Sequence, residues 1–167
     1  SLTSGGRIYQ DSTGYVVANT LNLSAVTGIS LPNVGPIFVN SVQNLGTITN
    51  TTSGGIVIAN YSGSNTGLTG NITAAGQSVS ITDVAGGIVQ SGGTITADTL
   101  SLSATGGINA TRNNSITSLG PVSSGGGFSF VNTGQLYLTG NINAAGQTVS
   151  LTANSGQIEQ TAGGIIT

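Results

Sequence analysis

Residues 70–93, GNITAAGQSVSITDVAGGIVQSGG, return with few changes at residues 140–164 as GNINAAGQTVSLTANSGQIEQTAGG. A second pair of related stretches is ANTLNLSAVTGI at 18–29 and ADTLSLSATGGI at 97–108. GGIVIAN at 54–60 likewise resembles GGFSFVN at 126–132. The sequence therefore predicts one segment over residues 1–167, built from super-repeats 5–85 and 86–162 with a partial third from 163.

Within the repeats, apolar and polar residues alternate strictly. Val79, Ile81, Leu100 and Leu102 are each followed by Ser or Thr, and such runs are short. A period of two is typical of strands with one apolar face. The runs are separated by glycine-rich stretches such as AAGQ and SGG, which favour sharp corners. We therefore expect an all-β chain with essentially no α-helix.

Equivalent positions recur at a nearly constant spacing, as in the steps from Val79 to Leu100 and from Ile88 to Ile108. A unit of about 20 residues cannot bury its apolar face alone, but stacked copies bury a continuous one. The spacing predicts a parallel β-helix (β-solenoid) of roughly eight coils, about 40 Å long. Each super-repeat would comprise three to four coils, a whole number of them, with the variable stretches 30–53 and 109–125 as loops. A Greek-key sandwich is the alternative fold, but it gives no reason for this spacing.

The composition excludes several functions. Gly, Thr, Ser and Asn number 28, 24, 21 and 16, against 2 Lys+Arg and 4 Asp+Glu, so polarity comes from hydroxyls and amides. Without clustered Lys or Arg, we expect no nucleic-acid partner. No apolar run is long enough to cross a membrane. Since the chain has no Met and stops within a repeat, we expect a segment of a longer polypeptide.

The inventory of reactive side chains argues against an enzyme. The chain has no His, Cys or Lys, and its carboxylates are Asp11, Asp83, Asp98 and Glu159. Cleavage of a glycosidic bond needs a pair of carboxylates or a Ca²⁺ cluster with a base. These carboxylates do not recur from one super-repeat to the next, because Asp83 aligns with Ala153. We therefore expect no catalytic residue, no metal site and no cofactor.

Candidate ligand-binding residues are few. Asn71, Asn141 and Tyr137 are the candidates for contacts with a glycan, and Phe128 and Phe130 could extend Tyr137 into a strip that stacks on sugars. The favoured interpretation of both Asn residues is structural, because a corner amide can bond the backbone of the neighbouring coil. The same applies to the three glutamines of the repeats, Gln10, Gln90 and Gln160. We expect both Phe residues in the core and Tyr137 pointing outward.

The phrases GNITAAGQSVSIT, GGTITADTLSLSATGGI and LTGNINAAGQTVSLTANSGQI resemble the repeats of filamentous haemagglutinin and related large bacterial exoproteins exported by two-partner secretion. The resemblance covers residues 68–108 and 136–167, and less closely 5–29. It implies a right-handed parallel β-helix that is secreted by a Gram-negative bacterium and acts in attachment. It brings no catalytic residue, and it leaves open whether the parent chain carries an adhesive tip or a toxin.

These observations predict a function for the chain. It would be the structural shaft of a secreted bacterial adhesin, holding a binding tip away from the cell and offering a Ser/Thr/Asn surface for attachment. The alternative is a self-assembling subunit of an extracellular or biofilm matrix fibre, since coil ends are unpaired strand edges. The expected partners are other copies end to end, host or surface polysaccharide, and an outer-membrane export protein. The expected location is the cell surface or the extracellular matrix.

Overall fold

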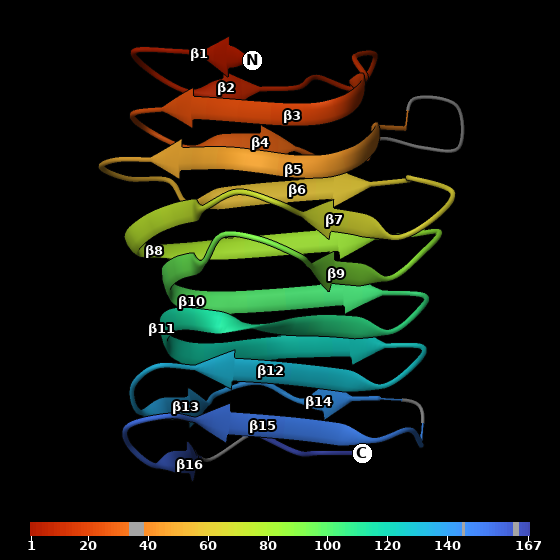
Figure 1. The fold of residues 1–167 in the computed structure, drawn as a ribbon. Helices are drawn as coiled ribbons and strands as arrows, with labels where there is room; N and C mark the ends of the chain where they lie inside the picture. The colour runs from red at the N-terminus through yellow and green to blue at the C-terminus, as the bar shows by residue number, and fades with distance from the viewer. Residues whose placement is uncertain (34–38, 145, 162–163) are drawn as a thin grey trace.

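The chain folds into a parallel β-helix, with strands stacked along one axis from the N-terminus at one end to the C-terminus at the other (Figure 1). The computed structural model describes residues 1–33, 39–144, 146–161 and 164–167. In these residues the strands are β1 (Leu2–Thr3), β2 (Ile8–Tyr9), β3 (Val17–Ala25), β4 (Ile29–Leu31), β5 (Ser41–Asn50), β6 (Ile56–Asn60), β7 (Thr66–Leu68), β8 (Ile72–Asp83), β9 (Ile88–Gln90), β10 (Ile95–Ala104), β11 (Ile108–Ser124), β12 (Phe128–Asn132), β13 (Leu136–Leu138), β14 (Ile142–Asn143), β15 (Val149–Ala153) and β16 (Ile158–Gln160). The start of the partial third repeat, at residue 163, lies outside them.

All pairings between these strands are parallel, and they define the turns of the helix. One column of stacked residues contains Ile8, Ile29, Ile56, Val79, Leu100, Leu119, Leu138 and Gln160. This column gives about seven turns of about 21 residues, close to the predicted eight. The prediction of an all-β chain is confirmed, and the described residues contain no helix long and apolar enough to cross a bilayer.

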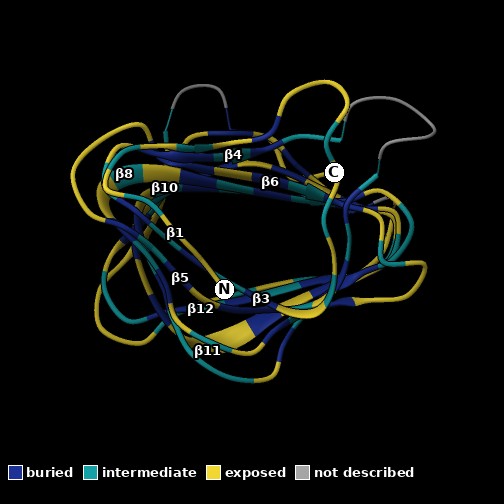
Figure 2. Ribbon diagram, turned by 90° about the horizontal axis from the view of Figure 1, so that it is seen from above, coloured by how far each residue is buried: buried dark blue, intermediate teal, exposed yellow. Residues whose placement is uncertain are grey.

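The helix has three sides, and one column of inward-facing residues identifies each. Side 1 contains Thr66, Ile88, Ile108, Phe128 and Val149; side 2 contains Leu2, Leu23, Ile48, Ile72 and Ile95; and side 3 contains Leu31, Ile58, Ile81, Leu102, Val122 and Ile142. The view down the axis shows β4, β6, β8 and β10 along one wall and β3, β11 and β12 along the opposite wall (Figure 2). Most of these inward side chains are fully buried, and together they form one apolar core that is continuous along the axis.

The duplicated phrases do not lie on the same sides, which was not predicted. Ile72 belongs to side 2, whereas its counterpart Ile142 belongs to side 3. Ile81 belongs to side 3, whereas its counterpart Leu151 pairs with Phe130 in the strand that carries side 1. With turns of about 21 residues, the chain between equivalent positions of the two phrases completes three turns and then runs along one further side. The expectation that a super-repeat spans a whole number of coils is therefore wrong.

The two variable stretches are also not loops throughout. Residues 109–125 lie almost entirely in β11, the longest strand, which bends along more than one side and pairs with both β10 and β12. The stretch 30–53 contains β5. Pro121 is accommodated at a bulge of β11, where a missing backbone N–H is tolerated.

The turns differ in length instead. Ile29 pairs with Ile56, whereas Leu100 pairs with Leu119, so the turn that follows Ile29 is the longer of the two. A solenoid accepts such differences, because extra residues in a corner leave the stacked strands in register.

Candidate binding surface

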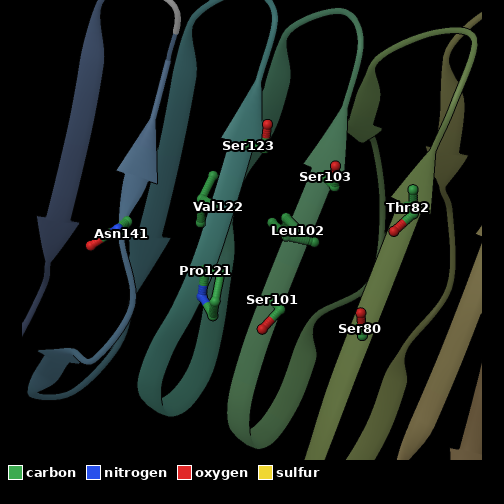
Figure 3. Close-up of a pocket in the computed structure, with 9 residues that line it drawn as sticks. All are labelled: Ser80, Thr82, Ser101, Leu102, Ser103, Pro121, Val122, Ser123 and Asn141. Carbon is green, nitrogen blue, oxygen red and sulfur yellow. The ribbon is translucent and has the colours of Figure 1, made fainter. Parts of the chain in front are cut away.

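The outer face of side 3 carries two rows of small polar residues across adjacent turns. Strands β8, β10, β11 and β14 place Thr82, Ser103, Ser123 and Asn143 in register as one row. Ser80 pairs with Ser101 in the other row, which continues towards Pro121 and Asn141 (Figure 3). These residues point outward because they alternate with the buried Ile81, Leu102 and Val122.

A bulge in β11 interrupts the row that starts with Ser80. Leu100 pairs with Leu119 and Leu102 with Val122, so β11 has one residue more than β10 between these pairs. The extra residue lies at Gly120–Pro121, next to Ser101. Beside it the surface is hollowed by a volume of about 360 Å³, lined by Ser80, Thr82, Ser101, Leu102, Ser103, Pro121, Val122, Ser123 and Asn141.

A second hollow of about 380 Å³ adjoins the first. The two share Thr82, Ser103 and Ser123, and the second continues to Asp83, Val84, Ala104, Thr105, Ser124, Gly125 and Asn143. We call the two together the hydroxyl trough. It extends along the rod axis over four successive strands, because its rows follow the stacking direction.

The hydroxyl groups of the first hollow are available, whereas those of Thr105 and Ser124 in the second donate to backbone carbonyl groups. The side-chain hydroxyls of Ser80, Thr82, Ser101, Ser103 and Ser123 have no hydrogen-bond partner among the described residues. The first hollow is lined by no charged side chain. Hydroxyl groups both donate and accept hydrogen bonds, so the trough offers both functions to a ligand.

The one carboxylate among the lining residues of the trough, in its second hollow, is internally bonded. Asp83 is 1% exposed, and its Oδ2 accepts hydrogen bonds from the Thr66 N–H (3.0 Å), the Thr66 hydroxyl (2.6 Å) and the Ser62 hydroxyl (3.0 Å). Its Oδ1 accepts from the Ala85 N–H at 3.1 Å. Asp83 therefore holds the turn at 61–66 and the following corner, and its charge is directed into the protein.

The three predicted ligand-binding residues are not brought together. Asn141 lies in the trough, whereas Asn71 lies at the corner before side 2, where its Oδ1 accepts from the Thr94 N–H at 3.0 Å. The Asn141 Oδ1 accepts from the Ile165 N–H at 3.2 Å. Both amides thus bond the next coil, as the structural interpretation predicted. Tyr137 is outward and half-buried, beside Ser118 and Glu159 of the adjacent strands.

Gln10, Gln90 and the two Phe residues also agree with their structural interpretation, whereas Gln160 bonds within its own turn. Gln10 donates to the carbonyl oxygens of Gly14 (2.7 Å) and Pro32 (3.0 Å), and the Gln90 Oε1 accepts from the Arg112 N–H at 3.2 Å. Gln160 donates to the Gly164 carbonyl. Phe128 and Phe130 are buried in the core, with ring centroids 6.2 Å apart.

The remaining charged residues form no cluster that could hold a metal ion. Within the described residues there is no group of three or more His, Cys, Asp or Glu side chains. Asp11 is exposed, and hydrogen bonds from the Thr13 N–H, the Thr13 hydroxyl and the Gly14 N–H lower its pKa below the usual 3.8. The Arg7 guanidinium lies 4.4 Å from the ring centre of Tyr9, and Arg112 donates to the Ser91 carbonyl at 2.5 Å.

Sequence reasoning missed a set of buried asparagines at the corners. Their Oδ1 atoms accept hydrogen bonds from backbone N–H groups of other segments, and the set is Asn40, Asn50, Asn60, Asn114 and Asn132. Several of them end an alternating run at an inward position, as in GTITN, IVIAN and FSFVN. An amide at an apolar position of the alternation was therefore the available signal. The trough had no such signal, because its rows depend on the register of β8, β10, β11 and β14.

Comparison of the chain with family models, with curated proteins and with solved structures gave no match. The arguments on function therefore depend on the fold, the trough and the composition.

Proposed function

We propose that this chain is a structural shaft of a secreted bacterial adhesin, which holds a binding tip away from the cell and offers its outer hydroxyls and amides for attachment. The observation that carries the proposal is the unbroken apolar core through about seven turns. In such a solenoid each coil contacts only its neighbours, so length is gained without loss of rigidity. At about 4.8 Å per coil, this segment contributes about 34 Å of reach.

The chemistry of the surface fits a shaft better than an enzyme. Asp83, the buried carboxylate, uses both oxygens in holding its own turn, which leaves it unsuited to proton transfer. The net charge of −2 gives no field that would concentrate a charged substrate. The resemblance of the repeats to those of filamentous haemagglutinin is the basis for three parts of the proposal: secretion, a Gram-negative source and an outer-membrane export partner.

The self-assembling fibre subunit is a second candidate, favoured by the terminal coils. Exposed apolar side chains gather there: Leu2, Tyr9, Tyr15 and Val17 near one end, and Ile158, Ile165 and Ile166 near the other. Strands β1 and β16 each have a single pairing partner. Further coils of the same polypeptide would cover these edges equally well, and the shaft is therefore the first proposal.

Two measurements separate the candidates. Spin labels at the outward positions Thr3 and Thr152, in the first and last turns, should give one narrow distance distribution if the segment is a rigid shaft. Sedimentation and electron microscopy of the purified segment should then show single rods. A broad distance distribution would overturn the shaft, and end-to-end filaments that lengthen with concentration would favour the fibre.

A further inference from the structure

We propose that the hydroxyl trough binds a neutral polysaccharide chain that lies along the rod axis. The inference rests on the proposed function, because it assigns the attachment surface of the shaft to one side and one class of ligand. Its three observations are the adjoining hollows on side 3, the unpartnered Ser and Thr hydroxyls of the first hollow, and the lack of charged side chains there.

The repeat of the trough suits an extended polymer. Successive strands lie about 4.8 Å apart, so a row in register presents its side chains at nearly constant spacing. The row Thr82, Ser103, Ser123 and Asn143 is continuous, and the row that begins at Ser80 and Ser101 runs parallel to it. A chain of sugar rings along the axis would meet the hydroxyls of Thr82, Ser103 and Ser123 on one edge and those of Ser80 and Ser101 on the other.

The chemistry of the trough selects a neutral glycan. Sugar hydroxyls need partners that both donate and accept, which serine and threonine provide. In the first hollow no internal hydrogen bond of a Ser or Thr has to be broken, because these hydroxyls are unpartnered within the described residues. Pro121 is exposed at the bulge and offers C–H groups to the apolar face of a sugar ring. A polyanion would find no cation in the first hollow, so charge gives it no advantage.

The expected affinity for one segment is low. A hydrogen bond exchanged with water contributes little on balance, and the trough is shallow and lacks an aromatic platform. A shaft with many coils would present several troughs to one polymer, and linked sites raise the overall affinity without any new contact. Millimolar binding by the isolated segment is therefore compatible with firm attachment by an array.

The test uses nuclear magnetic resonance of the ¹⁵N-labelled segment, titrated with maltoheptaose and cellohexaose as neutral probes and a heparin oligosaccharide as the anionic one. We expect amide shifts for Ser80–Thr82, Ser101–Ser103, Val122, Ser123 and Asn141 with a neutral probe. The double variant Ser101→Val with Ser103→Val should weaken binding at least fivefold. The matched control is Thr73→Val with Thr96→Val, outward on side 2, which should bind like the parent chain.

Three outcomes would overturn the inference: no shifts with either neutral probe, equal losses in the two double variants, or stronger binding of heparin. Sedimentation of both variants completes the test. If the trough variant abolished an association between rods that the control retained, the trough would be a contact between copies and not a glycan site. None of these outcomes alters the spin-label distance, so failure of this inference is distinguishable from failure of the shaft.

Discussion

Asn60 and Asn132 lie far apart in the sequence, yet each makes the same pair of hydrogen bonds with one backbone residue of the preceding turn. The Asn60 side chain accepts from the Val42 N–H (2.9 Å) and donates to the Val42 carbonyl (2.7 Å). The Asn132 side chain does the same with Ile116, at 3.0 Å in both bonds. Both asparagines are fully buried. At these corners the backbone hydrogen bonds between strands are interrupted. Each amide side chain makes the two bonds that the backbone of a neighbouring strand would otherwise make.

Replacing either amide should destabilise the fold strongly. Asn60→Ala or Asn132→Ala leaves a buried N–H and a buried carbonyl unpaired, and each unsatisfied group costs about 1–3 kcal/mol. We expect a loss of about 2–5 kcal/mol in the free energy of unfolding for each variant. Chemical denaturation measures it, with Asn109→Ala as the control, because Asn109 is exposed on side 1. Similar stabilities of all three variants would contradict the proposed role.

These asparagines were not predicted from the sequence, whereas other features of the fold were. The alternation around Val79 and Leu100 predicted the strands, their parallel stacking and the direction of each side chain, because period two leaves only one face for the core. The positions of Phe128 and Tyr137 followed from the same rule. The side of the helix on which each strand lies could not be predicted, because strands and corners of similar length fit any of the three sides. The hydroxyl trough could not be predicted either, because its rows depend on the register of four strands, including one extra residue in β11.

Charge substitutions on alternate positions test the register of side 3. Leu102→Asp places an unpaired carboxylate in the core, where Leu102 is 1% exposed, and should cost more than about 4 kcal/mol. Ser101→Asp, one position away, points outward and should change stability by less than about 0.5 kcal/mol. Thermal and urea unfolding compare the two. Equal damage at both positions would refute the register.

Some corners have no room for a side chain. A Cβ atom on Gly125 would overlap the carbonyl oxygen of Thr105 in the preceding turn, because the backbones of successive corners are in contact there. Gly125→Ala should therefore cost about 1–3 kcal/mol or more, as overpacking does. Gly134→Ala is the control, since no atom lies within 4 Å of its Cβ position. A melting temperature unchanged by Gly125→Ala would show that the backbones at Gly125 and Thr105 can move apart at little cost in stability.

Asp11 should report local structure at low pH. Its pKa is lowered by hydrogen bonds from the Thr13 N–H, the Thr13 hydroxyl and the Gly14 N–H, which favour the carboxylate. The turn at 11–14 is thus stabilised above pH 3.8 and loses that stabilisation as the pH falls through the folded pKa. Carboxyl ¹³C shifts should give a midpoint below 3.8, rising in Thr13→Val and unchanged in Thr111→Val. A native midpoint at or above 3.8 would contradict the assignment.

The rotation of the duplicated phrases by one side predicts that a side, and not a whole coil, is the interchangeable unit of this solenoid. Deletion of residues 70–139 joins Thr69 to Gly140 and removes three turns plus one side. Ile142 would then take the place of Ile72 on Ile48, and Val149 that of Val79 below Ile56. The inward positions of these two strands stay apolar, so we expect a shorter rod that unfolds cooperatively.

Two further deletions make this test decisive. Removal of Val79–Thr99 takes out one turn and joins Ser78 to Leu100, so this chain should fold whichever unit is interchangeable. Removal of residues 70–79 puts corners over strands and should abolish folding in either case. The deletion of 70–139 folds only if phrases can change sides. A molten 70–139 deletion beside a folded Val79–Thr99 deletion would show that each phrase is fitted to its own side, and that the duplication was accommodated by later changes in the core.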